Sequence, residues 1–179
     1  MKKRIIKPEF FNDEPIEVAK NLLGKFICRK FDNGTVQRWC ITETEAYDDK
    51  EKVTYKNEMF IGVGKWCPYS GMIMINCHKD TDPNHNPNHD NVLIRALDCV
   101  KGPCKIVDEL RIKEISDEIM QKNVLCQDKL WLEDWGITVD NPEQGKRKGL
   151  TKNKTSEEEK TAHKNFEAKV LHYPFEAIE

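Results

Sequence analysis

The chain lacks the features of exported and membrane proteins. It has no Cys-x-x-Cys pair, and its seven cysteines (28, 40, 67, 77, 99, 104 and 126) are an odd number that cannot all pair within one chain. This pattern is typical of a reducing cytosol. Residues 1–11 lack a signal-peptide stretch, and no apolar run approaches the roughly 20 residues that span a bilayer. We therefore expect a soluble, cytoplasmic protein without contact to a membrane.

The chain also lacks a strong net charge. Its formal charge is −2, so the average field around it does not attract a polyanion. Binding to nucleic acid would therefore depend on local basic patches, and the sequence offers two. They are Lys2, Lys3, Arg4 and Lys7, and then Lys146, Arg147, Lys148, Lys152 and Lys154. Each run on its own is more often a solvated face or tail.

Internal repeats and domain boundaries are missing as well. At 179 residues the chain fits one domain, since single cores commonly hold about 100 to 200 residues. Hydrophobic residues make up 38% and charged residues 34% of the sequence, which is enough apolar material for a packed interior under a charged surface. We predict a single domain over residues 1–179.

Apolar periodicity predicts a mixed α+β fold. A helix capped by Asp13 and ending at Gly24 precedes two strands joined by a turn at 32–34. Strands are expected at 26–30, 36–47, 72–77 and 91–97, a loop at 78–90, and helices opening at Gly102-Pro103, at 116–120 and at Ser156. These elements predict a meandering, largely antiparallel sheet.

Two carboxylates end the longest predicted strand. Period-2 alternation places Trp39, Ile41, Glu43, Glu45 and Tyr47 on one face. Carboxylates beside an aromatic ring can include one whose pKa is raised by burial, which suits general acid–base chemistry. The same pattern also describes a strand that leaves the core with both glutamates solvated, and from spacing alone this second interpretation is favoured.

Arg95 is a charged residue within an apolar strand. It shares a strand face with Leu93 and Leu97, so burial of that face would require a carboxylate or carbonyl partner for its guanidinium. Glu45 is the candidate partner. A structural salt bridge of this kind does not exclude a catalytic role for either residue.

Segment 77–90 is rich in groups that can bind a metal. They are Cys77, His78, Asp80, Asp82, His85, His89 and Asp90. Prolines interrupt the helix on which the spacing of His85 and His89 would aim both at one ion, and no paired cysteines complete a tetrahedral set. We expect a surface loop and no metal. Stoichiometric zinc in protein purified without a His tag would instead indicate a metal-binding interaction module.

Several motifs together resemble one known family. The matching pieces are Pro8-Glu9-Phe10-Phe11, Leu22-Leu23-Gly24-Lys25, Glu43-Thr44-Glu45-Ala46-Tyr47, Gly71-Met72 with Asn76, Val92-Leu93-Ile94-Arg95-Ala96-Leu97, Gly102-Pro103-Cys104-Lys105 and Leu130-Trp131-Leu132-Glu133. In this order, over most of the chain, they resemble the alkyladenine (3-methyladenine) DNA glycosylase family. The resemblance implies an α+β single domain, with a curved antiparallel β-sheet, packed helices and a protruding β-hairpin.

The resemblance also implies a monofunctional DNA glycosylase of base excision repair, which hydrolyses the N-glycosidic bond of flipped-out alkylated purines. Glu45 matches the general base that activates water, and Arg95 matches the arginine that orients this water. Tyr47 matches an aromatic wall for the base, and Asn76 an asparagine that crowds normal guanine. The implied partner is double-stranded DNA with damaged bases, bound by a monomer without a cofactor. In a prokaryote the protein would be nucleoid-associated.

Some positions depart from the family pattern. The pocket histidine falls at 53–55, where Tyr55 is the expected replacement, and Ser70 stands in place of the wedge tyrosine. Tyr69 or Trp66 is therefore expected to fill the gap left by the flipped base, although aromatic residues of small domains are more often core. The expected DNA contacts also include Lys105, Lys146, Arg147 and Lys148. These departures leave an alternative, a non-catalytic DNA-binding relative that recognises distorted or damaged sites.

Overall fold

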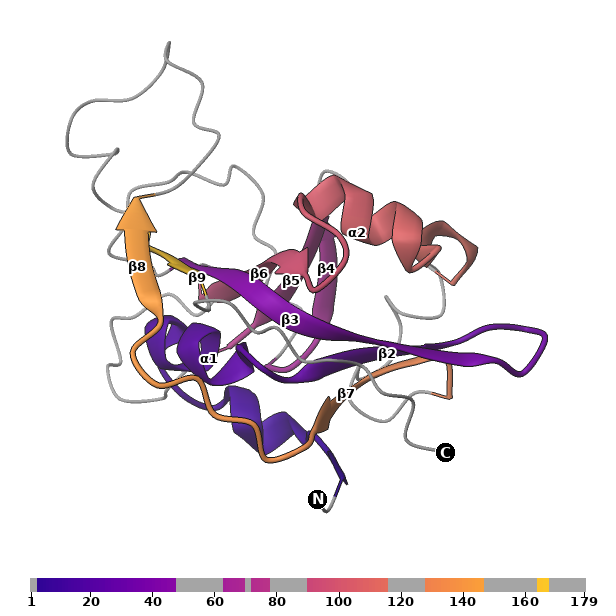
Figure 1. The fold of residues 1–179 in the computed structure, drawn as a ribbon, viewed down its shortest axis with the longest axis horizontal. Helices are drawn as coiled ribbons and strands as arrows, with labels where there is room; N and C mark the ends of the chain where they lie inside the picture. The colour runs from indigo at the N-terminus through magenta and orange to yellow at the C-terminus, as the bar shows by residue number, and fades with distance from the viewer. Residues whose placement is uncertain are drawn as a thin grey trace, which may run out of the picture.

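Most of the described residues lie in one antiparallel sheet. The computed structural model describes residues 3–47, 63–69, 72–77, 90–115, 128–146 and 164–167, with the backbone alone at 67–69, 146 and 164–167. The strands are β1 (Arg4–Ile5), β2 (Phe26–Lys30), β3 (Val36–Tyr47), β4 (Trp66–Tyr69), β5 (Met72–Asn76), β6 (Asn91–Leu97), β7 (Leu130–Asp134), β8 (Glu143–Lys146) and β9 (Lys164–Glu167). They run in the order β1-β7-β2-β3-β6-β5-β4, and β9 pairs with β3 and β8 (Figure 1).

The described helices are α1 (Pro15–Leu22), α2 (Pro103–Glu109) and the 3₁₀ helices η1 (Pro8–Phe11) and η3 (Ile112–Glu114). The apolar stripe of α1 is completely buried at Val18, Ala19 and Leu22. It shares one hydrophobic core with the buried side of α2 and with β3, β5 and β6. The helices therefore cover one face of the sheet. None of the helices within the described ranges is long and apolar enough to cross a membrane.

The predicted α+β architecture is confirmed. The expected strands at 26–30, 36–47 and 91–97 have the observed bounds, and the strand expected at 72–77 ends one residue earlier. The turn before β3 is closed by a hydrogen bond from the Phe31 amide to the Thr35 carbonyl (2.8 Å), with Gly34 at a φ of +83°. β4 and β5 form a second hairpin, in which Trp66 is in register with Ile75.

Other local predictions are wrong. Glu14, not Asp13, is the N-cap of α1 and makes no capping hydrogen bond through its side chain. Strands β8 and β9 were not expected, because 140–155 has the polar, turn-rich composition of a loop and Ser156 resembles a helix start. The loop at 78–89, the helix at 116–120 and the helix start at Ser156 lie outside the described residues.

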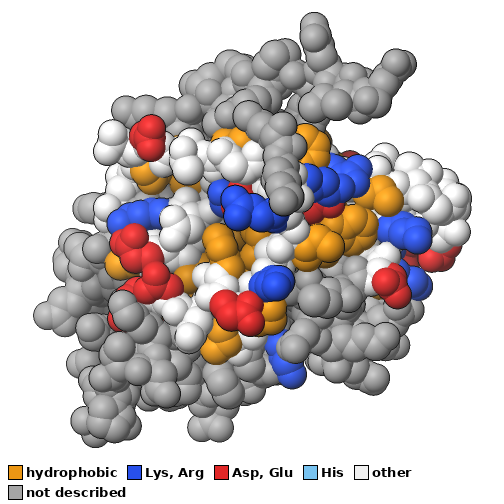
Figure 2. Space-filling model, turned by 90° about the horizontal axis from the view of Figure 1, so that it is seen from below, with side chains coloured by type: hydrophobic (Ala, Val, Ile, Leu, Met, Phe, Trp, Pro, Cys, Tyr) orange, Lys and Arg blue, Asp and Glu red, His pale blue; other side chains and the backbone are white. Residues whose placement is uncertain are grey.

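A smaller apolar cluster lies on the opposite face of the sheet. It consists of Phe26, Cys28, Cys40 and Ile137, whereas Ile27 belongs to the helix-covered core, as the alternation along a strand requires. Figure 2 shows that apolar side chains on the face seen from below are interspersed with both acidic and basic ones.

Glu133 on β7 is a buried carboxylate that receives four donors. Trp131 Nε1 (2.7 Å) and Lys3 Nζ (2.8 Å) contact Oε1, while Trp135 Nε1 (3.0 Å) and Arg38 Nε (3.1 Å) contact Oε2. Burial acts to raise the pKa of Glu133, but the donors outweigh it and lower this pKa from 4.5 to about 2. One carboxylate thus links the N-terminal segment, β3 and β7.

We expect Glu133→Gln to destabilise the protein by about 2–3 kcal/mol at pH 7. Because the folded-state pKa is depressed, the contribution of Glu133 is present above its unfolded value of 4.5 and is lost as the pH falls toward 2. The difference in unfolding free energy from wild type should therefore narrow over this window, as measured by urea denaturation. A difference that is independent of pH would contradict the assignment. Glu17→Gln, at the exposed ion pair with Lys20, is the control.

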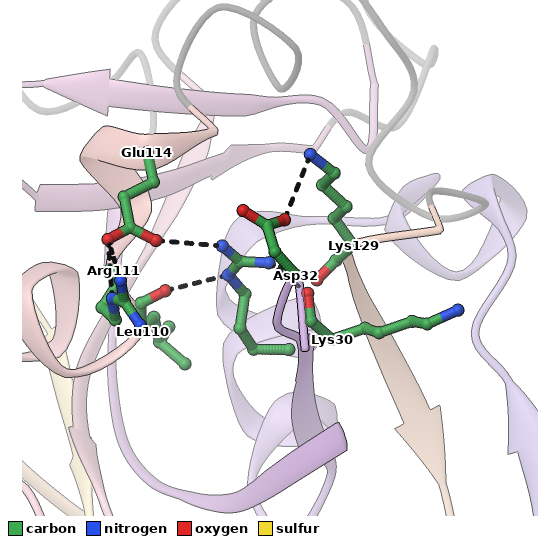
Figure 3. A network of polar contacts seen from close by, with 7 residues as sticks. Lys30, Asp32, Leu110, Arg111, Glu114 and Lys129 are labelled. Atoms are coloured by element: carbon green, nitrogen blue, oxygen red, sulfur yellow. Dashed lines mark hydrogen bonds and ion pairs between the residues drawn. The ribbon is translucent and has the colours of Figure 1, made fainter. Parts of the chain in front are cut away.

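Arg29 on β2 anchors the chain that follows α2. Its side chain is 1% exposed, and its Nε donates to the carbonyl of Leu110 at 3.1 Å. Nη1 donates to the carbonyls of Lys30 and Lys129, and Nη2 lies 3.8 Å from the carboxylate of Glu114. Figure 3 shows these acceptors converging from separate segments. A buried guanidinium satisfied in this way fixes the end of α2 against β2.

Candidate active site

A pair of strand irregularities determines which way the two glutamates of β3 point. Ile41 pairs with Leu97, Glu43 with Ala96, and Thr44 with Ile94, so the register shifts on both sides of Glu43. Trp39 and Ile41 belong to the helix-covered core, but so does Ala46. The alternation of faces therefore changes between residues 41 and 46, as expected of a β-bulge.

The prediction that all five alternate residues of β3 share one face is therefore wrong. Trp39 and Ile41 pack under the helices, and the Thr44 hydroxyl donates to the Ala19 carbonyl of α1 (2.9 Å). Glu45 and Tyr47, which alternate with Thr44 and Ala46, point to the other face. The bulge gives the strand an apolar anchor at its start and places the carboxylate of Glu45 on the opposite side of the sheet.

The same shift acts on β6. Val92, Ile94 and Leu97 all belong to the helix-covered core, so alternation is interrupted between Ile94 and Leu97. Arg95 consequently shares its face with Leu93, as predicted, but not with Leu97. Because β6 pairs with β3, Arg95 lies on the face that carries Glu45.

Glu45 is the centre of a buried polar cluster. Its carboxylate is completely buried and accepts hydrogen bonds from the Tyr47 hydroxyl on Oε1 (3.0 Å) and from Arg95 Nη1 on Oε2 (2.5 Å). Arg95 Nε lies 3.3 Å from Oε1 of Glu43. The ion pair predicted between Arg95 and Glu45 is thus present, and the solvated-strand interpretation does not hold.

The guanidinium of Arg95 is firmly charged. Burial acts to lower the pKa of Arg95, but the charge of Glu45, the hydrogen bond with Glu45 and the charge of Glu43 together raise this pKa above its ordinary value. Counted over the residues that the structure describes, the cluster has one guanidinium beside two glutamates and so more acidic than basic groups. It can therefore orient a water molecule and stabilise a positive charge that develops on a ligand.

Asn76 lies in one cross-strand row with Tyr47. Asn91 of β6 is in register with Tyr47 on one side and with Asn76 on the other, and Asn76 Nδ2 donates to Asn91 Oδ1. All three side chains are buried. The next row along the same face contains Glu45, Leu93 and Met74, of which the last two are buried apolar residues. Four sequence-predicted residues, namely Glu45, Tyr47, Asn76 and Arg95, therefore occupy one face of three adjacent strands.

The remaining predicted residues are not brought to this cluster. Trp66 is only 2% exposed and belongs to the helix-covered core beside Ile75, so its indole lies in the core and not on the surface. Lys105 is exposed on α2, and the backbones of Tyr69 and Lys146 lie in β4 and β8. The side chains of Tyr69 and Lys146, and the whole of Tyr55, Arg147 and Lys148, lie outside the described part of the chain.

Three features of the cluster were not predicted. Glu43 was noted only as a neighbour of Glu45, although its position two residues before Glu45 was a visible signal. Asn91 gave no signal, because its partner Asn76 is distant in sequence. Strand β9 pairs with β3 so that Asn165 is in register with Glu45, and the backbone of Glu45 is thereby held between β6 and β9.

No cluster of three or more histidine, cysteine, aspartate or glutamate residues able to hold a metal occurs among the described residues. Segment 78–89 is outside them, so the expectation of a metal-free loop there stays a prediction.

The chain matches a known protein family. The family model described as methylpurine-DNA glycosylase (MPG) matches residues 9–101, slightly more than half of the chain. The matched range begins in η1, includes α1 and strands β2 to β6, and ends shortly after β6. It therefore contains every residue of the buried polar cluster described above.

Proposed function

The chain belongs to the methylpurine-DNA glycosylase family, and from this premise we propose that it hydrolyses the N-glycosidic bond of alkylated purines flipped out of duplex DNA, using water activated by Glu45. Membership places it among the DNA glycosylases, hydrolases that act in the repair of alkylated purines. Bases of the 3-methyladenine and 7-methylguanine type are the proposed substrates. The buried ion pair between Glu45 and Arg95 is the observation that carries the proposal.

Glu45 is proposed to hold and deprotonate the water that attacks C1′ of the deoxyribose. A carboxylate can accept about four hydrogen bonds, so donation from Tyr47 and Arg95 is compatible with its also binding a water. Arg95, whose Nη1 donates to Glu45, fixes the direction of the carboxylate. As the bond to the base breaks, positive charge develops on the sugar and the acidic cluster stabilises it.

The substrate itself supplies part of the driving force. A purine alkylated on a ring nitrogen is cationic and leaves readily, so no nucleophilic lysine is required. An aromatic ring at Tyr47 suits an electron-poor, positively charged base through cation–π attraction. Its hydroxyl donates to Glu45, which couples the proposed stacking wall to the proposed general base. Asn76 is proposed to exclude normal guanine by crowding its exocyclic amino group.

Contacts with the duplex are proposed for the residues outside this cluster. Lys105, exposed at the start of α2, is proposed to contact a phosphate, as are Lys146, Arg147 and Lys148. Tyr69 is the proposed wedge now that Trp66 is a core residue, and Tyr55 is the proposed replacement for the pocket histidine. We propose that one domain acts as a monomer on double-stranded DNA.

The proposal is tested by base release. Duplexes carrying 7-methylguanine, 3-methyladenine, ethenoadenine or hypoxanthine are incubated with the protein, and free base is measured by chromatography. Release of at least one damaged base, with an intact sugar–phosphate backbone, is the expected result. Release of none, by protein shown to be folded, would defeat the proposal.

The burial of Trp66 favours a second candidate function. It removes one of two residues available for the gap left by a flipped base, so the chain could instead recognise distorted sites without catalysis. Damage-selective binding without product, insensitive to replacement of Glu45, distinguishes this candidate from the glycosylase.

A further inference from the structure

Glu43 contacts Arg95 from a different side than Glu45 does. Oε1 of Glu43 lies 3.3 Å from Arg95 Nε, whereas Oε2 of Glu45 meets Nη1. We propose that Glu43 is a positioning residue, which acts through Arg95 to keep Glu45 an effective base. This proposal rests on the proposed function, because it assigns a role within the same site.

The geometry makes Glu43 a restraint on the guanidinium. A guanidinium is a rigid planar fork that prefers to meet a carboxylate with two parallel donors. Here Nη1 of Arg95 donates to Glu45, whereas the buried Nε lies 3.3 Å from Oε1 of Glu43 without making a hydrogen bond, so Glu43 acts on the guanidinium through its charge. Without the charge of Glu43, the fork is expected to turn and pair with Glu45 through two donors.

The charges lead to the same conclusion. An opposite charge beside a carboxylate favours its ionised form and makes it a weaker base, whereas a neighbouring like charge has the reverse effect. Because Glu43 also faces Arg95, its negative charge limits how far the positive charge of Arg95 offsets that of Glu45. A general base that must take a proton from water benefits from this limit.

Among the residues that the structure describes, Arg95 is the cation of the cluster. Its titratable neighbours are Glu43, Glu45 and Tyr47 of β3. On β9, Glu167 and Lys164 are in backbone register with Glu43 and Ala46. On the β6 side, Lys101 forms a bridge with Ala96 and is exposed. The bulge is what makes the arrangement possible, because both register shifts flank Glu43.

The test is the pH dependence of single-turnover base release by the full-length protein. For Glu43→Gln we expect the plateau rate to fall by about 3–10-fold. The acid limb of the profile should move to lower pH, because Glu45 then faces the whole charge of Arg95. Glu43→Asp keeps the charge with a shorter reach, so its rate and limb should lie between those of wild type and Glu43→Gln.

The matched control is Glu114→Gln, which removes a carboxylate from an arginine pair outside the site and should leave both rate and limb unchanged. A slower Glu43→Gln with an unmoved acid limb would reduce Glu43 to a structural role and overturn the proposal. So would a rate and limb equal to wild type. If Glu43→Gln does not fold, Glu43→Asp decides: a smaller shift to lower pH supports the proposal and an unmoved limb overturns it. Absence of base release by the wild-type protein is the separate outcome that defeats the proposed function, and this proposal with it.

Discussion

Base release from alkylated DNA is expected to fall by about 10³-fold when Glu45 is replaced by glutamine. Glutamine has nearly the same shape, and its amide oxygen can still accept from Arg95 while its amide nitrogen donates to the Tyr47 hydroxyl oxygen, but it cannot take a proton from water. Single-turnover chromatography of released base measures the loss. Affinity for a duplex with an abasic-site analogue, measured by fluorescence anisotropy, should be largely unchanged, because the carboxylate contributes to the chemical step and not to DNA binding.

The control for this substitution is a second buried carboxylate. Glu133→Gln also removes a buried charge, but from β7, which is separated from β3 by β2. It is expected to lose stability while keeping base release per folded molecule. Base release by Glu45→Gln at the wild-type rate would exclude Glu45 as the general base.

Replacement of Arg95 by methionine is expected to lower both stability and activity. The change leaves the carboxylates of Glu43 and Glu45 buried without their shared cation, and breaking a buried pair in this way costs about 3–5 kcal/mol. Loss of the oriented donor should also slow base release by about 10²-fold. Urea denaturation and single-turnover assays at a temperature where the variant stays folded measure the two effects separately.

A double variant separates the loss of stability of Arg95→Met from its loss of activity. Combining Arg95→Met with Glu43→Gln removes one of the two carboxylates that lose their contact with Arg95, so part of the lost stability should return while base release stays low. Arg111→Met is the control, because Arg111 is 57% exposed at its ion pair with Glu114 and exposed pairs contribute about 0–1 kcal/mol. If Arg95→Met were as stable as this control, Arg95 would not be the cation that balances the buried glutamates.

The sheet was predictable where its signal is local. The bounds of β2 and β3 follow from alternating apolar residues on either side of the Asp32-Asn33-Gly34 turn, because turn residues and period-2 burial are properties of short segments. Strands β8 and β9 carry no such pattern. They are strands because the end of β3 offers β9 an edge to pair with, and this depends on the rest of the fold.

The candidate site could be predicted in its membership but not in its orientation. Glu45, Tyr47, Asn76 and Arg95 were found through motifs. The face on which they lie depends on where the register between β3 and β6 shifts. The spacing of residues within one strand cannot predict a shift in register between two strands. The burial of Trp66 agrees with the general tendency of aromatic residues in small domains to be core, but its place beside Ile75 depends on the pairing of β4 with β5.

Strand β9 gives the C-terminal part of the chain a share in the site. Residues 9–101 contain the whole polar cluster, yet the backbone of 43–46 is completed on one side by 164–167. A fragment limited to the matched range would present these amides and carbonyls as an open edge, prone to pairing with other molecules. The pairing of the strand segment that bears Glu45 is therefore completed by residues beyond the matched range, with β6 on one side and β9 on the other.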